Sequence, residues 1–94
     1  MAKSTSAWVK SNDDGSITVT LSRPREIEGA QVSTLTLREP TVDDQLSASE
    51  AKGSEVLKEI TLLANLAMVP VSEVRKLPVR DYQRLQAAFA NFID

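Results

Sequence analysis

The sequence predicts an α+β fold in which an N-terminal β-hairpin is followed by three to four short α-helices packed on it. Apolar and polar residues alternate over residues 17–21 and 32–37, which is the period of a strand with one buried face. The alternation stops at Pro40, and apolar residues recur beyond it with the helical period. A two-stranded hairpin is marginal in water by itself, so its apolar face needs the helices as a cover.

The chain has 94 residues, which is enough for one small domain, and we assign that domain to residues 16–94. Residues 1–15 are polar, and we expect them to form a flexible N-terminal tail. Their end is marked by a cluster of turn-forming residues, Ser11-Asn12-Asp13-Asp14-Gly15-Ser16.

An alternative for this segment is a short strand. Trp8 and Val9 can fold back over Asp14-Gly15 onto Ile17, because an Asp-Gly pair suits a tight hairpin turn. The two hypotheses differ in whether Trp8 and Val9 pair with the strand that begins at Ile17.

The hairpin itself has a clear inner face. The residues on that face are Ile17, Val19, Leu21, Leu35 and Leu37. Glu28-Gly29 can make the reversal between the strands. Pro24 has no amide hydrogen, so it belongs at an edge, at a bulge or just outside the paired region.

The segment Leu35-Thr36-Leu37-Arg38-Glu39-Pro40-Thr41-Val42-Asp43-Asp44 joins the second strand to the first helix. Thr41 can accept a hydrogen bond from a first-turn amide, and Asp43 and Asp44 place negative charge where the helix dipole favours it. We expect this helix over residues 41–52.

The first helix has a thin apolar stripe. Only Val42 and Leu46 form a clear stripe, and Gly53 is a plausible C-terminal stop. We therefore expect neighbouring elements, rather than its own amphipathicity, to order this helix.

The second helix, over residues 54–68, is the strongest element. One arc of apolar residues forms the predicted core side: Val56, Ile60, Leu63 and Ala67, with Leu57, Ala64 and Met68 beside them. Leu62 and Leu66 fall on a different side and need a second contact. Another helix of the same chain can cover them, or they can form a partner surface.

Pro70 ends the second helix, and residues 72–76 can form one short helical turn before Pro78. The last helix is predicted over residues 79–93, with Asp81 in its first turn. Its apolar arc consists of Tyr82, Leu85, Ala88, Phe89, Phe92 and Ile93. Core packing is the favoured role for these aromatic residues, with a recognition face as the alternative.

The composition argues against catalysis. There is no histidine and no cysteine, which removes the commonest general base, a common nucleophile and the main transition-metal ligands. The three glycines form no phosphate-binding loop, and Asp13-Asp14 and Asp43-Asp44 read as turn and cap residues. We expect no enzyme activity, no cofactor and no metal.

The charge distribution argues against nucleic acid as a partner. Eleven basic and thirteen acidic residues give a net charge of -2, and Arg23 and Arg25 are soon followed by Glu26 and Glu28. No apolar run is long enough for a signal peptide or a membrane span. We expect a soluble, cytoplasmic protein without a membrane partner.

Two separated motifs carry a family resemblance. The strand-to-helix segment Leu-Arg-Glu-Pro-Thr at residues 37–41 and the segment Leu77-Pro78-Val79-Arg80-Asp81-Tyr82 occur in the order found in small phage tail assembly chaperones. From about Ile17 to Phe92 the chain resembles the chaperones of Mu-like and P2-like phages. Residues 1–15 carry no part of this resemblance.

The resemblance implies a function. It implies a chaperone that binds and solubilises the tape measure protein and helps to recruit tail tube subunits in the host cytoplasm, and that is absent from the mature virion. The candidate contact residues are Leu62, Leu66 and Phe92, and self-association is a further possibility because a small core gains from a second copy. The alternative is a small non-catalytic structural or adaptor subunit of a phage tail. We predict that replacing both leucines with lysine leaves the isolated domain folded and weakens partner binding.

Overall fold

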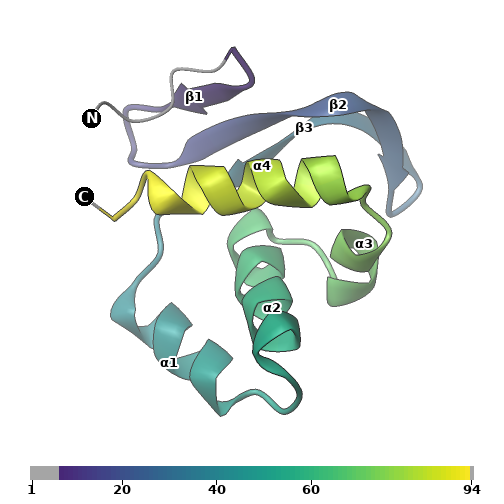
Figure 1. Cartoon of the computed structure of the whole chain (residues 1–94). Helices are drawn as coiled ribbons and strands as arrows, with labels where there is room; N and C mark the ends of the chain where they lie inside the picture. The colour runs from purple at the N-terminus through teal and green to yellow at the C-terminus, as the bar shows by residue number, and fades with distance from the viewer. Residues whose placement is uncertain (1–6, 94) are drawn as a thin grey trace.

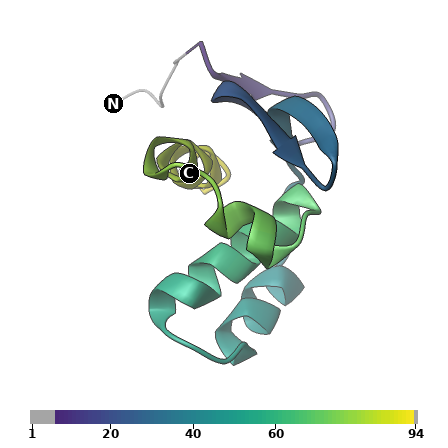
Figure 2. The same ribbon diagram turned by 90° about the vertical axis from the view of Figure 1, so that its right-hand side faces the viewer.

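The computed structural model describes residues 7–93 and has the predicted α+β fold. Its antiparallel sheet has the order β1-β2-β3, with strands at Val9–Ser11, Ile17–Ile27 and Ala30–Leu37. The helices that follow are α1 (Val42–Glu50), α2 (Glu55–Ala67), α3 (Val71–Arg75) and α4 (Val79–Ala90). Figures 1 and 2 show α4 lying across one face of the sheet, while α1 and α2 project away from it as a pair.

The β2–β3 hairpin confirms the expected turn and the expected place of Pro24. Glu28 and Gly29 both have positive φ, at 52° and 82°, so the reversal is a two-residue turn of the kind that matches strand twist. The ladder shifts between Thr20 and Arg25, so residues 21–24 lie opposite Ser33 alone. Pro24 lies in this bulge, where its missing amide hydrogen breaks no ladder bond.

The N-terminal segment forms the strand that was the alternative prediction. Val9–Ser11 pairs with β2 in antiparallel register, with Val9 opposite Val19, so the flexible tail does not extend over these residues. Residues 1–6 of the expected tail lie outside the described residues. Asp14 stabilises the turn by accepting hydrogen bonds from the amide and hydroxyl of Ser16, which lower the pKa of its carboxyl.

A contact from the other end of the chain also holds β1. The guanidinium of Arg84 on α4 lies 5.3 Å from the centre of the Trp8 ring, and its Nη1 donates to the Thr20 carbonyl at 2.7 Å. Thr20 in turn donates its amide to the Trp8 carbonyl at 2.8 Å. One cation therefore links the start of β1, the middle of β2 and α4.

The core lies between the sheet, α4 and the C-terminal half of α2. All five residues predicted for the inner face of the hairpin are buried, and Leu63 and Leu66 of α2 and Leu85 and Ala88 of α4 pack against them. Aliphatic side chains therefore form the centre, and the aromatic residues pack around it.

Several apolar residues that were predicted on the packed faces of the helices are exposed, among them Met68 at 77% and Ile93 at 57%. Val42 and Leu46 of α1 are 84% and 53% exposed, and the buried residue of this helix is Ala48. On α2, Val56 is 62% exposed, whereas Leu66 has no exposed surface. The reason is the direction of α2: its C-terminal half reaches the sheet and α4, and its N-terminal half projects away (Figure 1).

Asp81 has a structural role beyond the predicted first-turn position. Its side chain has no exposed surface, and it accepts hydrogen bonds from the amide of Ser22 at 2.8 Å and from the hydroxyl of Ser22 at 3.0 Å. The bulge in β2 frees the Ser22 amide from the ladder, so the carboxylate of α4 becomes its partner.

Replacing Asp81 with alanine should lower the free energy of unfolding by about 2 kcal/mol, because the Ser22 amide and hydroxyl then have no acceptor in a buried place. Asp81→Asn keeps one acceptor oxygen and should cost about half as much. Urea unfolding followed by circular dichroism measures both. Equal stability of Asp81→Ala and the wild type would contradict this role.

Candidate functional site

A groove opens where α1, α2 and the C-terminal half of α4 meet. Its volume is about 470 Å³. The lining residues are Ala48, Ser49, Glu55, Val56, Lys58, Glu59, Leu62, Leu63 and Phe89. Most of its lining residues belong to α1 and α2, which project away from the sheet (Figure 1).

The groove is apolar at its base and polar at its rim. Leu63 is buried, Leu62 and Phe89 are partly buried, and Val56 is the most exposed of the apolar lining residues. At the rim, Lys58 lies 3.7 Å from Glu55. An apolar base with a charged rim is the arrangement that accepts the apolar side chains of another helix.

Glu59 has a structural partner on α4. It accepts a hydrogen bond from the Tyr82 hydroxyl and a second one, at 3.0 Å, from Nε2 of Gln86. Burial and, secondly, the bond to Glu59 raise the pKa of the Tyr82 hydroxyl above its ordinary value of 10.0. Tyr82 therefore stays protonated at neutral pH and holds α4 against α2, which forms one wall of the groove.

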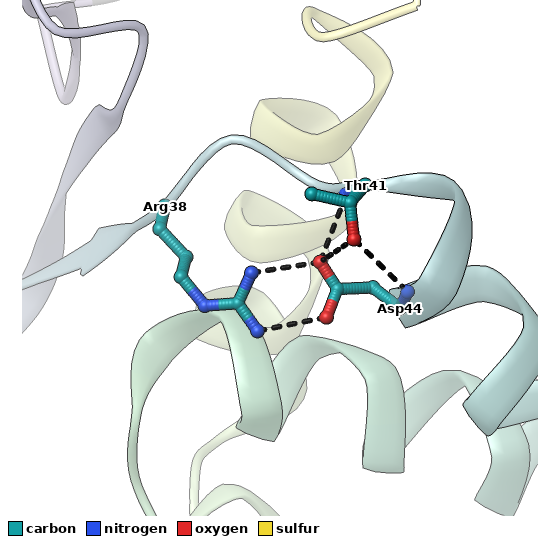
Figure 3. A network of polar contacts seen from close by, with 3 residues as sticks. All are labelled: Arg38, Thr41 and Asp44. Atoms are coloured by element: carbon teal, nitrogen blue, oxygen red, sulfur yellow. Dashed lines mark hydrogen bonds and ion pairs between the residues drawn. The ribbon is translucent and has the colours of Figure 1, made fainter.

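The strand-to-helix segment fixes α1, the opposite wall (Figure 3). Arg38, at the end of β3, donates from Nη1 and Nη2 to the two carboxylate oxygens of Asp44, at 2.7 and 2.8 Å. Asp44 also accepts from the Thr41 amide at 2.8 Å, and the Thr41 hydroxyl accepts from the Asp44 amide at 3.2 Å. The predicted cap at Thr41 is thus part of a reciprocal capping box.

This network ties three elements together. The Arg38 amide donates to the carbonyl of Leu66 at the end of α2, at 3.0 Å, so the residue that holds Asp44 also joins β3 to α2. The Arg38 side chain and, secondly, the Thr41 amide hold the pKa of the Asp44 carboxyl far below its ordinary value of 3.8. The hydrogen bonds between Arg38 and Asp44 raise the pKa of the Arg38 guanidinium.

We expect Asp44→Asn to lower the unfolding temperature at pH 7 by about 4–8 °C, corresponding to about 1 kcal/mol for a lost cap and a partly exposed ion pair. The folded-state pKa of Asp44 is depressed, so its stabilising effect is fully present above pH 3.8 and is lost as the pH falls through the folded value. Thermal unfolding of both proteins from pH 7 down to pH 2 should show converging curves in acid. A constant difference across that range would contradict the assignment.

The three predicted contact residues lie in different environments. Leu62 lines the groove. Phe92 is partly buried and packs edge-to-face on the groove residue Phe89, with ring centres 6.4 Å apart. Leu66 belongs to the core, so the intramolecular alternative is correct for this residue and it offers no surface to a partner.

Sequence reasoning assigned three groove residues to the core, Val56, Leu63 and Phe89, and of these only Leu63 is buried. Val56 and Phe89 occur at the helical spacing of the predicted apolar arcs. The local sequence does not distinguish a core position from a groove position on the same arc. Ala48 and Ser49 enter the lining because α1 folds back along α2, which requires the tertiary arrangement.

A metal site and a membrane span find no support among residues 7–93. This part of the chain has no group of three or more acidic side chains placed to hold a metal ion. It also has no helix that is long and apolar enough to cross a membrane. The groove is therefore the best candidate, and its chemistry is that of binding.

Comparison with known proteins gives one match. A family model described as "Phage tail assembly chaperone proteins, E, or 41 or 14" matches residues 18–94, so the matched region begins inside β2 and leaves β1 outside it. No curated protein and no solved structure matches the chain significantly.

Proposed function

The chain belongs to the phage tail assembly chaperone family, and we propose that it binds the tape measure protein through the groove between α1, α2 and α4 and helps to recruit tail tube subunits. The family supplies the general role in tail assembly. The observation that supports binding at this place is an open apolar groove with Leu62 and Phe89 at its base.

The physical reason for such a chaperone is the exposure of apolar stripes on a long helical partner. Such stripes aggregate unless they are covered until the tube subunits replace the cover. The groove offers a contact of limited size, and we expect binding there to be reversible. We propose that the protein acts in the host cytoplasm and leaves before the virion is complete.

Co-expression tests the binding step. The tape measure protein should be largely insoluble when it is expressed alone, and it should become soluble and co-purify when this chain is present. A tape measure protein that stays insoluble and unbound in the presence of the folded chain would contradict the proposal.

The fate of the protein separates this proposal from the alternative, a small structural or adaptor subunit of the tail. Quantitative mass spectrometry of assembly-stage lysates and of purified particles should find the chain with the tape measure protein in the first and not in the second. A fixed copy number in purified particles would instead support the structural subunit.

A further inference from the structure

Three arginines surround a second hollow, at the opposite end of α4 from the groove. This hollow, which we call the arginine hollow, has a volume of about 230 Å³. Its lining residues are Ser22, Arg23, Arg25, Pro78 and Arg80. Phe89 of the groove and Arg80 of the hollow are about 13 Å apart along the helix axis.

The bulge in β2 brings these charges together. The bulge ends at Arg25, which pairs with Val32. Arg25 and Ile27 are two residues apart on the strand, so their side chains lie on the same face of the sheet. The Ser22–Asp81 hydrogen bonds hold the first turn of α4 against the same stretch of β2. Arg80, the neighbour of Asp81, is thereby placed beside the two strand arginines.

The three arginines of the hollow form no ion pair within the part of the chain that the structure describes. No carboxylate of residues 7–93 lines the hollow. Asp81 is buried with both its oxygens bonded to Ser22. Nε of Arg25 is buried and has no hydrogen-bond partner, which is a costly state for a charged donor.

The start of α4 adds to this potential. Its cap residue, Pro78, provides no side-chain hydrogen bond, so the positive end of a 12-residue helix meets the arginines uncapped. Three guanidinium groups, one of which has a buried Nε–H without a partner, and a helix N-terminus lie around one small hollow. Each of these features favours an oxyanion.

We propose that the arginine hollow binds acidic side chains of a protein partner, as a site separate from the groove. The planar guanidinium fork matches a carboxylate in bidentate geometry. The volume suits one or two carboxylate side chains rather than a long polyanion. Val79, which is 70% exposed beside the hollow, offers an apolar contact to the neighbouring residue of the partner segment.

The surroundings disfavour a nucleic acid as the occupant. Arg25 also lines an adjoining hollow together with Glu26, Glu73 and Lys76, of which Glu73 pairs with Lys76 at 3.7 Å. The carboxylate of Glu26 would repel a phosphate backbone that continued past Arg25. Three cations also give only a small counterion-release gain, and the net charge of -2 opposes long-range attraction of a polyanion. A short acidic segment of a protein needs contacts only at the hollow, and it carries fewer charges for the net charge of the chain to repel.

The test uses hexaglutamate as the probe, titrated into the ¹⁵N-labelled full chain and followed by NMR at low salt. Backbone amide shifts should concentrate at residues 22–25 and 78–80, and the Nε–H signal of Arg25 should move with them. A variant carrying Arg23→Gln, Arg25→Gln and Arg80→Gln should bind hexaglutamate at least about tenfold more weakly. Circular dichroism should show that this variant is folded.

A charge-matched control carries Lys10→Gln, Lys52→Gln and Arg75→Gln, three exposed residues that do not line the arginine hollow. It should bind hexaglutamate like the wild type. Equal weakening in the two variants, shifts scattered over the surface, or no saturable shift at the hollow would overturn the proposal. Tighter binding of a thymidine hexanucleotide than of hexaglutamate at the same residues would also overturn it, in favour of nucleic acid. None of these outcomes depends on the tape measure protein, so failure here is distinct from failure of the proposed function.

Discussion

Leu66→Lys should prevent the domain from folding. The Leu66 side chain has no exposed surface and packs in the core formed by the sheet, α2 and α4, so lysine would place an unpaired charge where only apolar groups surround it. The loss of packing alone is about 2–5 kcal/mol, which is a large part of the stability of a small domain. The expected result is loss of the cooperative thermal transition, measured by far-UV circular dichroism.

Leu62→Lys is the matched control, because it makes the same chemical change on the same helix. Leu62 lies at the groove, where a lysine can keep its stem on the apolar base and extend its amine into water. This variant should therefore stay folded. A Leu66→Lys protein that folds cooperatively would contradict the assignment of Leu66 to the core. It would instead support the prediction from the sequence that both Leu62 and Leu66 can be replaced with lysine.

The second large effect concerns partner binding. Leu62→Lys and Val56→Lys should each reduce co-purification of the tape measure protein at least about tenfold, or about 1.4 kcal/mol, because each places a charge against the partner's apolar side chains. Val56 is mostly exposed, so its replacement should leave stability unchanged within about 0.5 kcal/mol. The measurement is the ratio of the two proteins after affinity purification of the complex.

Val42→Lys provides the control for this effect. Val42 is an exposed apolar residue of α1 that does not line the groove, so its replacement changes net charge and surface apolarity in the same way. It should leave co-purification intact. Equal loss with Val42→Lys would show that the effect follows general surface charge, and full retention by both groove variants would exclude the groove as the contact.

Local chemistry explains which parts of the fold could be predicted. The cap at Thr41, the turn at Glu28-Gly29 and the place of Pro24 each depend on residues within a few positions of one another. The ion pair from Arg38 to Asp44 was not predicted, because it requires the chain to turn back after β3. The ordering of β1 depends on Arg84, near the other end of the chain.

The faces of α1 and α2 show a different limit. Helical periodicity identified two apolar arcs on α2 but could not show that the helix crosses the sheet only with its C-terminal half, which buries Leu66 and exposes Val56. The N-terminal half of α2, which does not cross the sheet, supplies several of the residues that line the groove. Of the groove residues, only Leu62 was identified as a candidate contact from the sequence, because it lay outside the predicted core arc.

The most direct test of the groove as the binding site is photo-crosslinking in cells. A photoreactive benzoylphenylalanine at Val56 should crosslink to the tape measure protein on irradiation, because Val56 is both exposed and part of the groove lining. The same group at Thr34, exposed on β3, serves as the control and should give no such product. A crosslink to the tape measure protein from Val56 alone is the result that we predict. Equal crosslinking from the two positions, or a product from Thr34 only, would contradict the groove as the binding site.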